Sequence, residues 1–104
     1  MSKIIYVSGP MSGLPNENRE AFFKAEQFLN AHGFVVLNPA VNPAGLTYQQ
    51  YMTIDFAMLS VCNAIYMLTG HESSPGAKAE LAYAHCCDFK VYYEGKLSTE
   101  NVDN

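Results

Sequence analysis

Four short apolar runs are spaced along this chain, and a stretch with helical spacing of apolar residues lies between each run and the next. The runs cover residues 3–8, 34–37, 64–68 and 90–93. They are rich in Val, Ile and Tyr and are too short to be buried helices, so each predicts a strand. Strands that alternate with helices predict a parallel sheet, because parallel neighbours need a crossover connection between them.

Each predicted helix opens with a residue that can cap it. Asn16 can cap the first helix, which we expect to close at Gly33, and Thr47 can cap the second. Ser74 is followed by Pro75, which favours the first position of the third helix. The predicted helices cover residues 16–32, 47–61 and 74–87. The apolar stripe expected on the second helix consists of Tyr48, Met52, Phe56 and Leu59.

This order of elements predicts one α/β domain over residues 1–104. We expect three layers, with a mainly parallel sheet of four to five strands between helices on both faces, as in flavodoxin-like and Rossmann-like folds. Ligands bind at the carboxyl ends of the strands in such sheets. That edge should gather the loop after the first strand and the starts of the second and third helices.

The charge of the chain argues against a nucleic-acid partner. Its formal net charge is −4 at pH 7, with Arg19 the only arginine, whereas nucleic-acid binding needs a basic surface. We therefore expect a small-molecule partner. The apolar runs are too short to cross a membrane, and the three cysteines are not spaced as a disulfide framework. These features predict a cytoplasmic protein without a membrane partner, and the spacing of Cys and His predicts no metal site.

The loop after the first strand reads Ser-Gly-Pro-Met-Ser-Gly at residues 8–13. Its glycines would let a ligand approach the backbone, and its hydroxyl and N–H groups can bind sugar or phosphate oxygens. The loop matches neither the dinucleotide-binding fingerprint nor the Walker loop. A plain strand-to-helix turn is the alternative interpretation.

Two carboxylates, Glu80 and Asp55, could carry chemistry at the same edge. Glu80 lies one and a half turns into the third helix, so its side chain should lean over Gly76 and Ala77, which leave room for a sugar ring. Asp55 lies at the edge of the apolar stripe of the second helix. Two carboxylates that reach one cleft suit glycosidic chemistry, in which one attacks the sugar and the other holds or protonates a partner. Ordinary surface carboxylates are the alternative for both.

Three blocks of sequence resemble the nucleoside 2-deoxyribosyltransferase superfamily, which includes a branch of nucleotide N-hydrolases, and are most similar to its small phage and bacterial members. The blocks are Ile-Tyr-Val-Ser-Gly-Pro-Met at residues 5–11, Asp-Phe-Ala-Met-Leu at 55–59 with Cys-Asn-Ala at 62–64, and Ser-Pro-Gly-Ala at 74–77 followed by Glu80 and Leu-Ala-Tyr-Ala at 81–84. Their order and spacing match the family over most of the chain. The resemblance implies the three-layer α/β fold and glycosidic chemistry.

The resemblance also implies roles for individual residues. Glu80 falls at the position of the nucleophile that forms a glycosyl-enzyme intermediate, and Tyr6 falls where a tyrosine steers that glutamate. Asp55 falls where an aspartate contacts the sugar or the leaving base. Ser74 falls where the nucleotide hydrolases have a serine that meets a 5′-phosphate, which favours a nucleoside monophosphate as substrate.

One departure concerns the cation that the hydrolase branch carries in the first loop. This chain has Met11 and Ser12 at that place, so Arg19 could supply the charge, although a solvated helix residue is the alternative for Arg19. Family active sites can be completed by the C-terminal segment of a neighbouring subunit. We therefore expect a homo-oligomer, and we leave open whether residues 100–104 contribute to a neighbouring site.

The expected function is cleavage of the N-glycosidic bond of a nucleoside or nucleoside 5′-monophosphate, by hydrolysis or deoxyribosyl transfer, without a metal or other cofactor. A non-catalytic nucleotide-binding module and a nicotinamide-nucleotide glycohydrolase are the alternatives. The predicted catalytic residues are Glu80, Tyr6 and Asp55. The predicted substrate contacts are Ser8, Gly9, Pro10, Met11, Ser74, Gly76 and Arg19.

Overall fold

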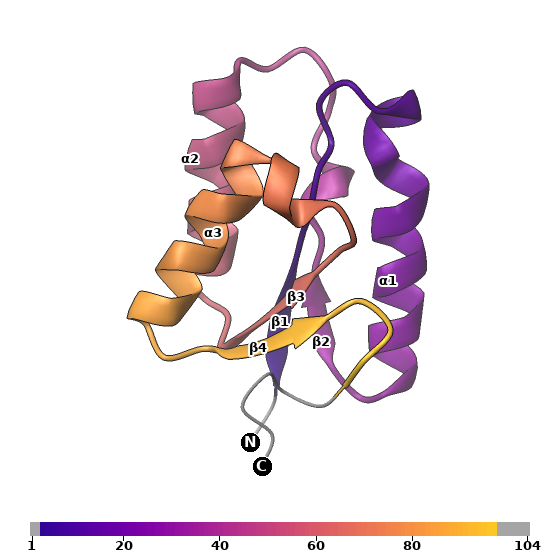
Figure 1. Ribbon diagram of the computed structural model, residues 1–104, viewed down its shortest axis with the longest axis vertical. Coiled ribbons are helices and arrows are strands. Elements are labelled where there is room, and N and C mark those ends of the chain that lie inside the picture. Colours follow the sequence, from indigo (N-terminus) through magenta and orange to yellow (C-terminus); the bar gives the residue numbers. More distant parts are fainter. Residues whose placement is uncertain (1–2, 98–104) are drawn as a thin grey trace.

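The computed structural model describes residues 3–97 as a parallel sheet with α-helices on both faces (Figure 1). The strands are β1 (Ile4–Ser8), β2 (Val35–Leu37), β3 (Ala64–Met67) and β4 (Lys90–Tyr93). The α-helices are α1 (Arg19–Ala31), α2 (Tyr48–Leu59) and α3 (Pro75–Cys86), and the short turns of 3-10 helix are η1 (Pro15–Asn18), η2 (Pro39–Val41) and η3 (His71–Ser73). The predicted α/β class and the order of its elements are confirmed.

The sheet has the order β2-β1-β3-β4, and every neighbouring pair is parallel. Tyr6 on β1 pairs with Leu37 on one side and with Ile65 on the other. The connection from β1 leads to β2 at one edge of the sheet, and the chain then crosses back over β1 to form β3 on its other side. The strand order therefore reverses direction between β1 and β3. In open α/β sheets, ligands bind at the carboxyl ends of the strands beside such a point.

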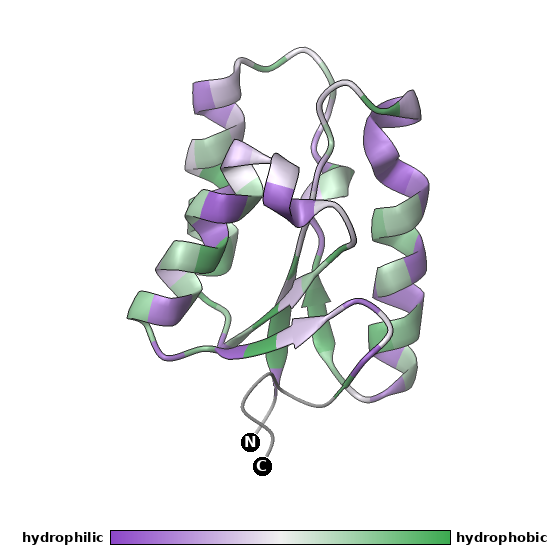
Figure 2. Cartoon of the chain, in the orientation of Figure 1, coloured by the Kyte–Doolittle hydropathy of each residue, from purple (hydrophilic) through white to green (hydrophobic). Residues whose placement is uncertain are grey.

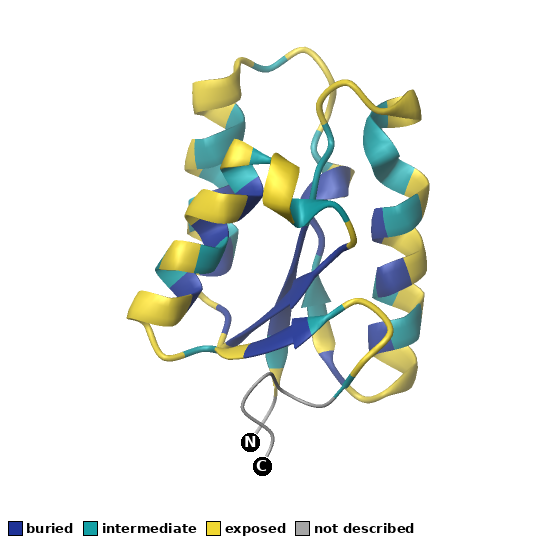
Figure 3. Ribbon diagram, viewed as in Figure 1, coloured by how far each residue is buried: buried dark blue, intermediate teal, exposed yellow. Residues whose placement is uncertain are grey.

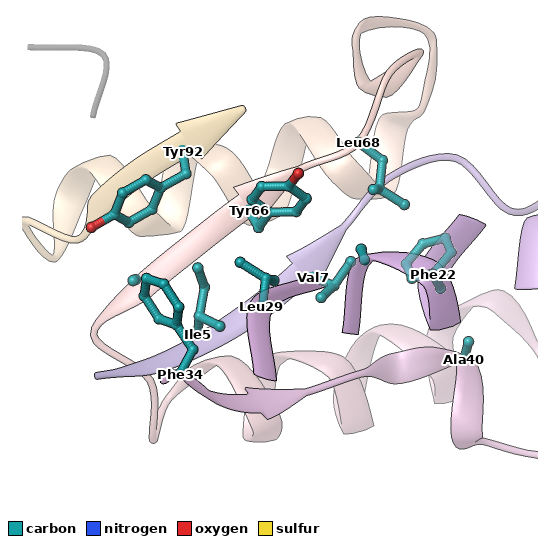
Figure 4. Packing of buried hydrophobic residues seen from close by; sticks show 11 residues of the cluster. Ile5, Val7, Phe22, Leu29, Phe34, Ala40, Tyr66, Leu68 and Tyr92 are labelled. Carbon is teal, nitrogen blue, oxygen red and sulfur yellow. The ribbon is translucent and has the colours of Figure 1, made fainter. Parts of the chain in front are cut away.

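Strand residues alternate between two apolar cores, one on each face of the sheet. On the face covered by α1, Ile5, Val7 and Tyr66 pack with Phe22 and Leu29 of the helix (Figure 4). On the face covered by α2 and α3, the packed residues are Tyr6, Ile65, Met67, Leu59, Ala77 and Ala84. Both faces of β1 and β3 are buried (Figure 3), which explains why these strands read as continuous apolar runs.

The α1 helix carries the apolar stripe that the sequence predicts. Phe22, Ala25 and Leu29 are buried against the sheet, and bands of hydrophobic and hydrophilic residues alternate along the helix (Figure 2). Burial of side chains of this size stabilises the fold by roughly 1.5–3 kcal/mol each for Phe and Leu. None of the helices within residues 3–97 is long and apolar enough to span a lipid bilayer.

The predicted start of α1 is wrong, because Asn16 does not cap a helix. Asn16, Glu17 and Asn18 instead adopt left-handed backbone angles, with φ of 51°, 55° and 60°. The helix begins at Arg19, and the Asn18 side chain donates a hydrogen bond to the carbonyl of Pro10 at 2.9 Å rather than to its own helix. Left-handed residues cost about 1–2 kcal/mol each outside glycine, so tertiary contacts must hold this turn.

The predicted cap of α2 is confirmed, and the predicted stripe is partly wrong. Thr47 and Gln50 form a reciprocal capping box. Tyr48 is 60% exposed, and the buried residues of the helix are Asp55 and Leu59. The inner face of α2 near its start therefore faces a cavity rather than the sheet, and Asp55, expected at the edge of the stripe, is buried.

Candidate active site

A cavity of about 480 Å³ opens at the carboxyl edge of the sheet. It lies between the loop that follows β1, the starts of α1 and α3, and the inner face of α2, which meet in the upper part of Figure 1. The predicted site residues that line it are Tyr6, Gly9, Pro10, Met11, Arg19, Asp55, Ser74, Gly76 and Glu80. This volume falls in the range of small-molecule sites.

Glu80 has its carboxylate held from both sides by β1. The Tyr6 hydroxyl donates to Glu80 Oε2 at 2.9 Å, and the Ser8 hydroxyl donates to Glu80 Oε1 at 2.7 Å. Tyr6 and Ser8 are two residues apart on the strand, so both side chains point toward α3. Ser8 does not itself line the cavity, because it is fully buried behind Glu80. The carboxylate is therefore fixed in position at the cavity wall.

Burial changes the ionisation of Glu80. Its carboxyl group is 5% exposed, and desolvation raises its pKa from 4.5 to about 7. The hydrogen bond from Ser8 opposes this rise, the negative charge of Asp55 adds to it, and the bond from Tyr6 lowers the pKa again. Near neutral pH the group is about half ionised, so a nucleophilic carboxylate and its protonated form are both present.

Asp55 lines the same cavity from α2. Desolvation raises its pKa from 3.8 to about 6, and a hydrogen bond with Tyr6 lowers it. Tyr6 therefore lies between the two carboxyl groups. Asp55 Oδ1 is buried and has no hydrogen-bond partner among the described residues. A buried acceptor without a partner is unfavourable, and a donor on a bound ligand would satisfy it.

The start of α3 brings Ser74 and Gly76 to the cavity. The Ser74 hydroxyl accepts a hydrogen bond from the Ala77 N–H at 3.2 Å and so caps the helix as predicted. A Cβ at Gly76 would lie 3.4 Å from Met52 Sδ, which is ordinary contact distance. Gly76 therefore marks where α2 and α3 approach each other at the cavity wall.

Gly9 lines the cavity and is also required for packing. A Cβ at Gly9 would lie 2.7 Å from Cβ of Leu68, which is a collision between two chain segments in the core.

We expect Gly9→Ala to lower the free energy of unfolding by about 1–3 kcal/mol, as overpacking does. Urea unfolding followed by circular dichroism measures this. Gly13→Ala is the contrast, because its Cβ would meet no atom within 4 Å and its penalty would come only from its positive φ. A Gly9→Ala variant as stable as the natural chain would contradict this reading of the contact.

Arg19 is neither solvated nor free. Its side chain is 22% exposed, and Nη2 lies 2.8 Å from Glu17 Oε1. Nη1 donates to the carbonyl of Ala40, and Nη2 also donates to the carbonyl of Asn42 at 3.3 Å. Arg19 therefore ties the left-handed turn to the loop after β2, with its charge balanced by Glu17.

Several residues that line the cavity were not predicted from the sequence. Tyr48, Tyr51 and Met52 of α2 form one wall, although the predicted apolar stripe placed Tyr48 and Met52 in the core. Glu17 and Asn42 line the region beside Arg19, and no local signal marks either residue. Among the described residues, no group of three or more His, Cys, Asp and Glu side chains could hold a metal ion. Residues 100–104, which we considered for a neighbouring site, lie outside the described range.

Residues 3–93 match the family model described as a domain of unknown function, DUF4406. The chain belongs to the DUF4406 family. That match runs from the start of β1 to the end of β4, so the DUF4406 domain contains the whole sheet and every residue of the cavity wall. None of the curated proteins matches the chain.

Proposed function

We propose that this DUF4406 protein cleaves the N-glycosidic bond of a nucleoside or nucleotide, with Glu80 as the nucleophile. One observation carries the proposal: the Glu80 carboxylate lies at the wall of a sugar-sized cavity with both oxygens held by the hydroxyls of Tyr6 and Ser8. A carboxylate fixed in this way needs little reorganisation before it attacks. The three blocks that resemble nucleoside 2-deoxyribosyltransferases supply these same residues.

The proposed reaction has two steps. A Glu80 oxygen forms a bond to C1′ of the sugar while the bond between C1′ and the base nitrogen breaks, and the base takes up a proton as it leaves. Water or a second base then attacks C1′ and gives a proton to the Asp55 carboxylate, while the bond to Glu80 breaks. Water gives hydrolysis and a second base gives transfer. The Tyr6 and Ser8 hydroxyls hold the carboxylate in both steps.

Asp55 is the proposed proton donor to the leaving base. It lines the cavity, and desolvation raises its pKa to about 6, against about 7 for Glu80. The reactive form, with Asp55 protonated and Glu80 ionised, is therefore the less populated of the two forms in which the pair shares one proton. Its unpartnered Oδ1 is available to the ligand. A donor that remains hydrogen-bonded to the leaving group lowers the barrier to its departure.

The aromatic wall of α2 would hold the base. Tyr48 and Tyr51 line the cavity with Met52, and the Tyr51 hydroxyl is tied to the carbonyl of Pro43 at 2.6 Å. A planar base can stack on rings held in this way. The base would thus lie against α2 while the sugar lies over Glu80.

The test is release of free base from a panel of nucleosides and their 5′-monophosphates, with NAD included, separated by chromatography. Release of free base from at least one compound supports the proposal. Saturable binding of a nucleotide with no base released at any enzyme concentration would instead identify a binding module. A protein that neither binds nor cleaves any of these compounds would contradict the proposed function. The homo-oligomer and the cytoplasmic location stay predictions from the sequence.

A further inference from the structure

The charged residues that line the described cavity are Glu17, Arg19, Asp55 and Glu80. Arg19 is the only cation among them, against three carboxylates. A substrate phosphate placed anywhere in this cavity would therefore meet more negative than positive charge. Phosphate sites are normally built with the opposite balance, from Arg or Lys side chains.

The Arg19 guanidinium already donates hydrogen bonds to other groups of the chain. Both terminal nitrogens of Arg19 donate to acceptors of the chain: Nη1 to Ala40, and Nη2 to Glu17 and Asn42. Glu17 supplies the balancing charge at 2.8 Å. These bonds leave other N–H groups of the guanidinium for a ligand, but a phosphate that uses them would meet a charge that Glu17 already balances.

The backbone holds Glu17 beside Arg19 in an unusual conformation. Glu17 has φ of 55°, which is uncommon for a residue that is neither Gly nor Asn. Strained backbone of this kind persists where surrounding contacts maintain it, and it clusters at functional sites. The left-handed turn thus places a carboxylate beside Arg19 at the cavity wall.

The α3 start offers little to an anion. Pro75 has no N–H, the Ala77 N–H donates to Ser74 Oγ at 3.2 Å, and the Lys78 N–H donates to the Ser74 carbonyl at 2.9 Å. The N–H groups of Ala77 and Lys78 are therefore satisfied within the chain, and Gly76 supplies the one other N–H group of this turn at the cavity, although helix starts with more free N–H groups can bind phosphate.

The buried groups without partners favour a ligand with both donors and acceptors. Asp55 Oδ1 is a buried acceptor and Asn42 Nδ2 is a buried donor, and neither has a hydrogen-bond partner among residues 3–97. Both residues line the cavity. Sugar hydroxyls and base edges would satisfy them, so the ligand contacts that these groups need come from the nucleoside part of a substrate and not from a phosphate.

We propose that the pairing of Glu17 with Arg19 makes this site select nucleosides with a free 5′-hydroxyl over nucleoside 5′-monophosphates. The proposal rests on the glycosidic function of Glu80 and names the substrate class of that site. It differs from the monophosphate preference that Ser74 suggests in the sequence.

The first experiment compares each ribonucleoside and 2′-deoxyribonucleoside with its own 5′-monophosphate, by rate of base release and by calorimetric binding. We expect kcat/KM to be about 100-fold higher for the nucleoside than for its monophosphate, because the phosphate would meet more negative than positive charge and contacts between like charges are unfavourable. A monophosphate that is cleaved faster than its nucleoside would overturn the substrate assignment and leave the glycosidic function intact. If no base is released, the binding comparison still decides, with tighter binding of the nucleoside supporting the assignment and tighter or equal binding of the monophosphate overturning it. A protein that binds neither overturns both proposals.

The second experiment changes the pair itself. Glu17→Gln removes the carboxylate that balances Arg19, so the ratio of monophosphate to nucleoside kcat/KM should rise by about 10-fold. Glu20→Gln is the matched control, because it removes the same charge from an exposed position one residue beyond Arg19. Circular dichroism establishes that both variants are folded. An unchanged ratio in a folded Glu17→Gln variant, or an equal rise in Glu20→Gln, would contradict the role assigned to Glu17.

Discussion

Replacing Glu80 with Gln is expected to lower the rate of base release by at least about 10³-fold, which is the scale of loss when an enzyme loses its nucleophile. Gln has nearly the same shape as Glu and its side-chain oxygen can still accept the hydrogen bond from Tyr6. It cannot become a carboxylate, so it cannot form the glycosyl ester. Ground-state contacts with the sugar remain, so binding should weaken far less than turnover.

Two measurements separate this effect from unfolding or lost binding. Single-turnover rates with saturating variant enzyme report the chemical step, and calorimetric titration reports the affinity. Glu20→Gln is the control for the loss of one negative charge, because Glu20 is exposed on α1. A Glu80→Gln variant that releases base at one tenth of the natural rate or faster would show that another group attacks the sugar.

The same substitution is expected to stabilise the fold at alkaline pH. The pKa of Glu80 is about 7 in the folded chain against an ordinary value of 4.5, so the folded state holds a proton that the unfolded state has lost. The stability that this group contributes is fully present below about pH 4 and is lost as the pH rises through 7. Asp55, with its pKa raised to about 6, acts in the same direction.

Gln cannot ionise, so Glu80→Gln should remove much of this pH dependence. We expect the variant to exceed the natural chain in free energy of unfolding by about 2–3 kcal/mol at pH 8, and to match it closely at pH 4. Urea unfolding at several pH values between 4 and 8 measures the difference, with Glu20→Gln again as the control. A variant that is no more stable than the natural chain at pH 8 would mean that burial of the ionised Glu80 carboxylate does not destabilise the fold.

These two expectations have one physical origin. The site keeps a carboxylate in a poorly solvated place, where its charge is unfavourable for folding and where few water molecules compete with the substrate. Loss of activity together with gain of stability is the signature of a group retained for chemistry rather than for the fold.

The sheet and its helices could be predicted because their signals are local. The run at residues 90–93 is short, contains Val and Tyr and is followed by Glu94 and Gly95, and it forms β4 with those bounds. Ser74 followed by Pro75 marks the start of α3 within the chain itself. Parallel order follows from alternation of strands and helices, and the site then follows from the edge at which the strands end.

The turn before α1 could not be predicted, because distant contacts hold it. Arg19 donates to Ala40 and Asn42, which lie more than twenty residues further along the chain. A local pattern shows only that Asn16 can cap a helix. The left-handed conformation of Glu17, and with it the pairing with Arg19, depends on where the loop after β2 lies.

The environment of α2 was misjudged for a related reason. Helical spacing shows which residues share a face but does not show what that face meets. Leu59 meets the sheet and is fully buried, whereas Tyr48 on the same predicted stripe is 60% exposed at the cavity. Only the three-dimensional arrangement shows that the stripe changes from core to cavity wall along the helix, with Asp55 between the two.

The most direct test of the proposed nucleophile is the intact mass of the protein after incubation with a nucleoside whose sugar carries fluorine at C2′. Fluorine at that carbon destabilises the oxocarbenium-like transition state for breakdown of a glycosyl ester, so the intermediate should accumulate. We predict a mass increase equal to one fluorinated sugar, located on Glu80 by peptide fragmentation and absent from Glu80→Gln. Release of base by a protein whose mass does not change, or an adduct on any other residue, would contradict the central claim.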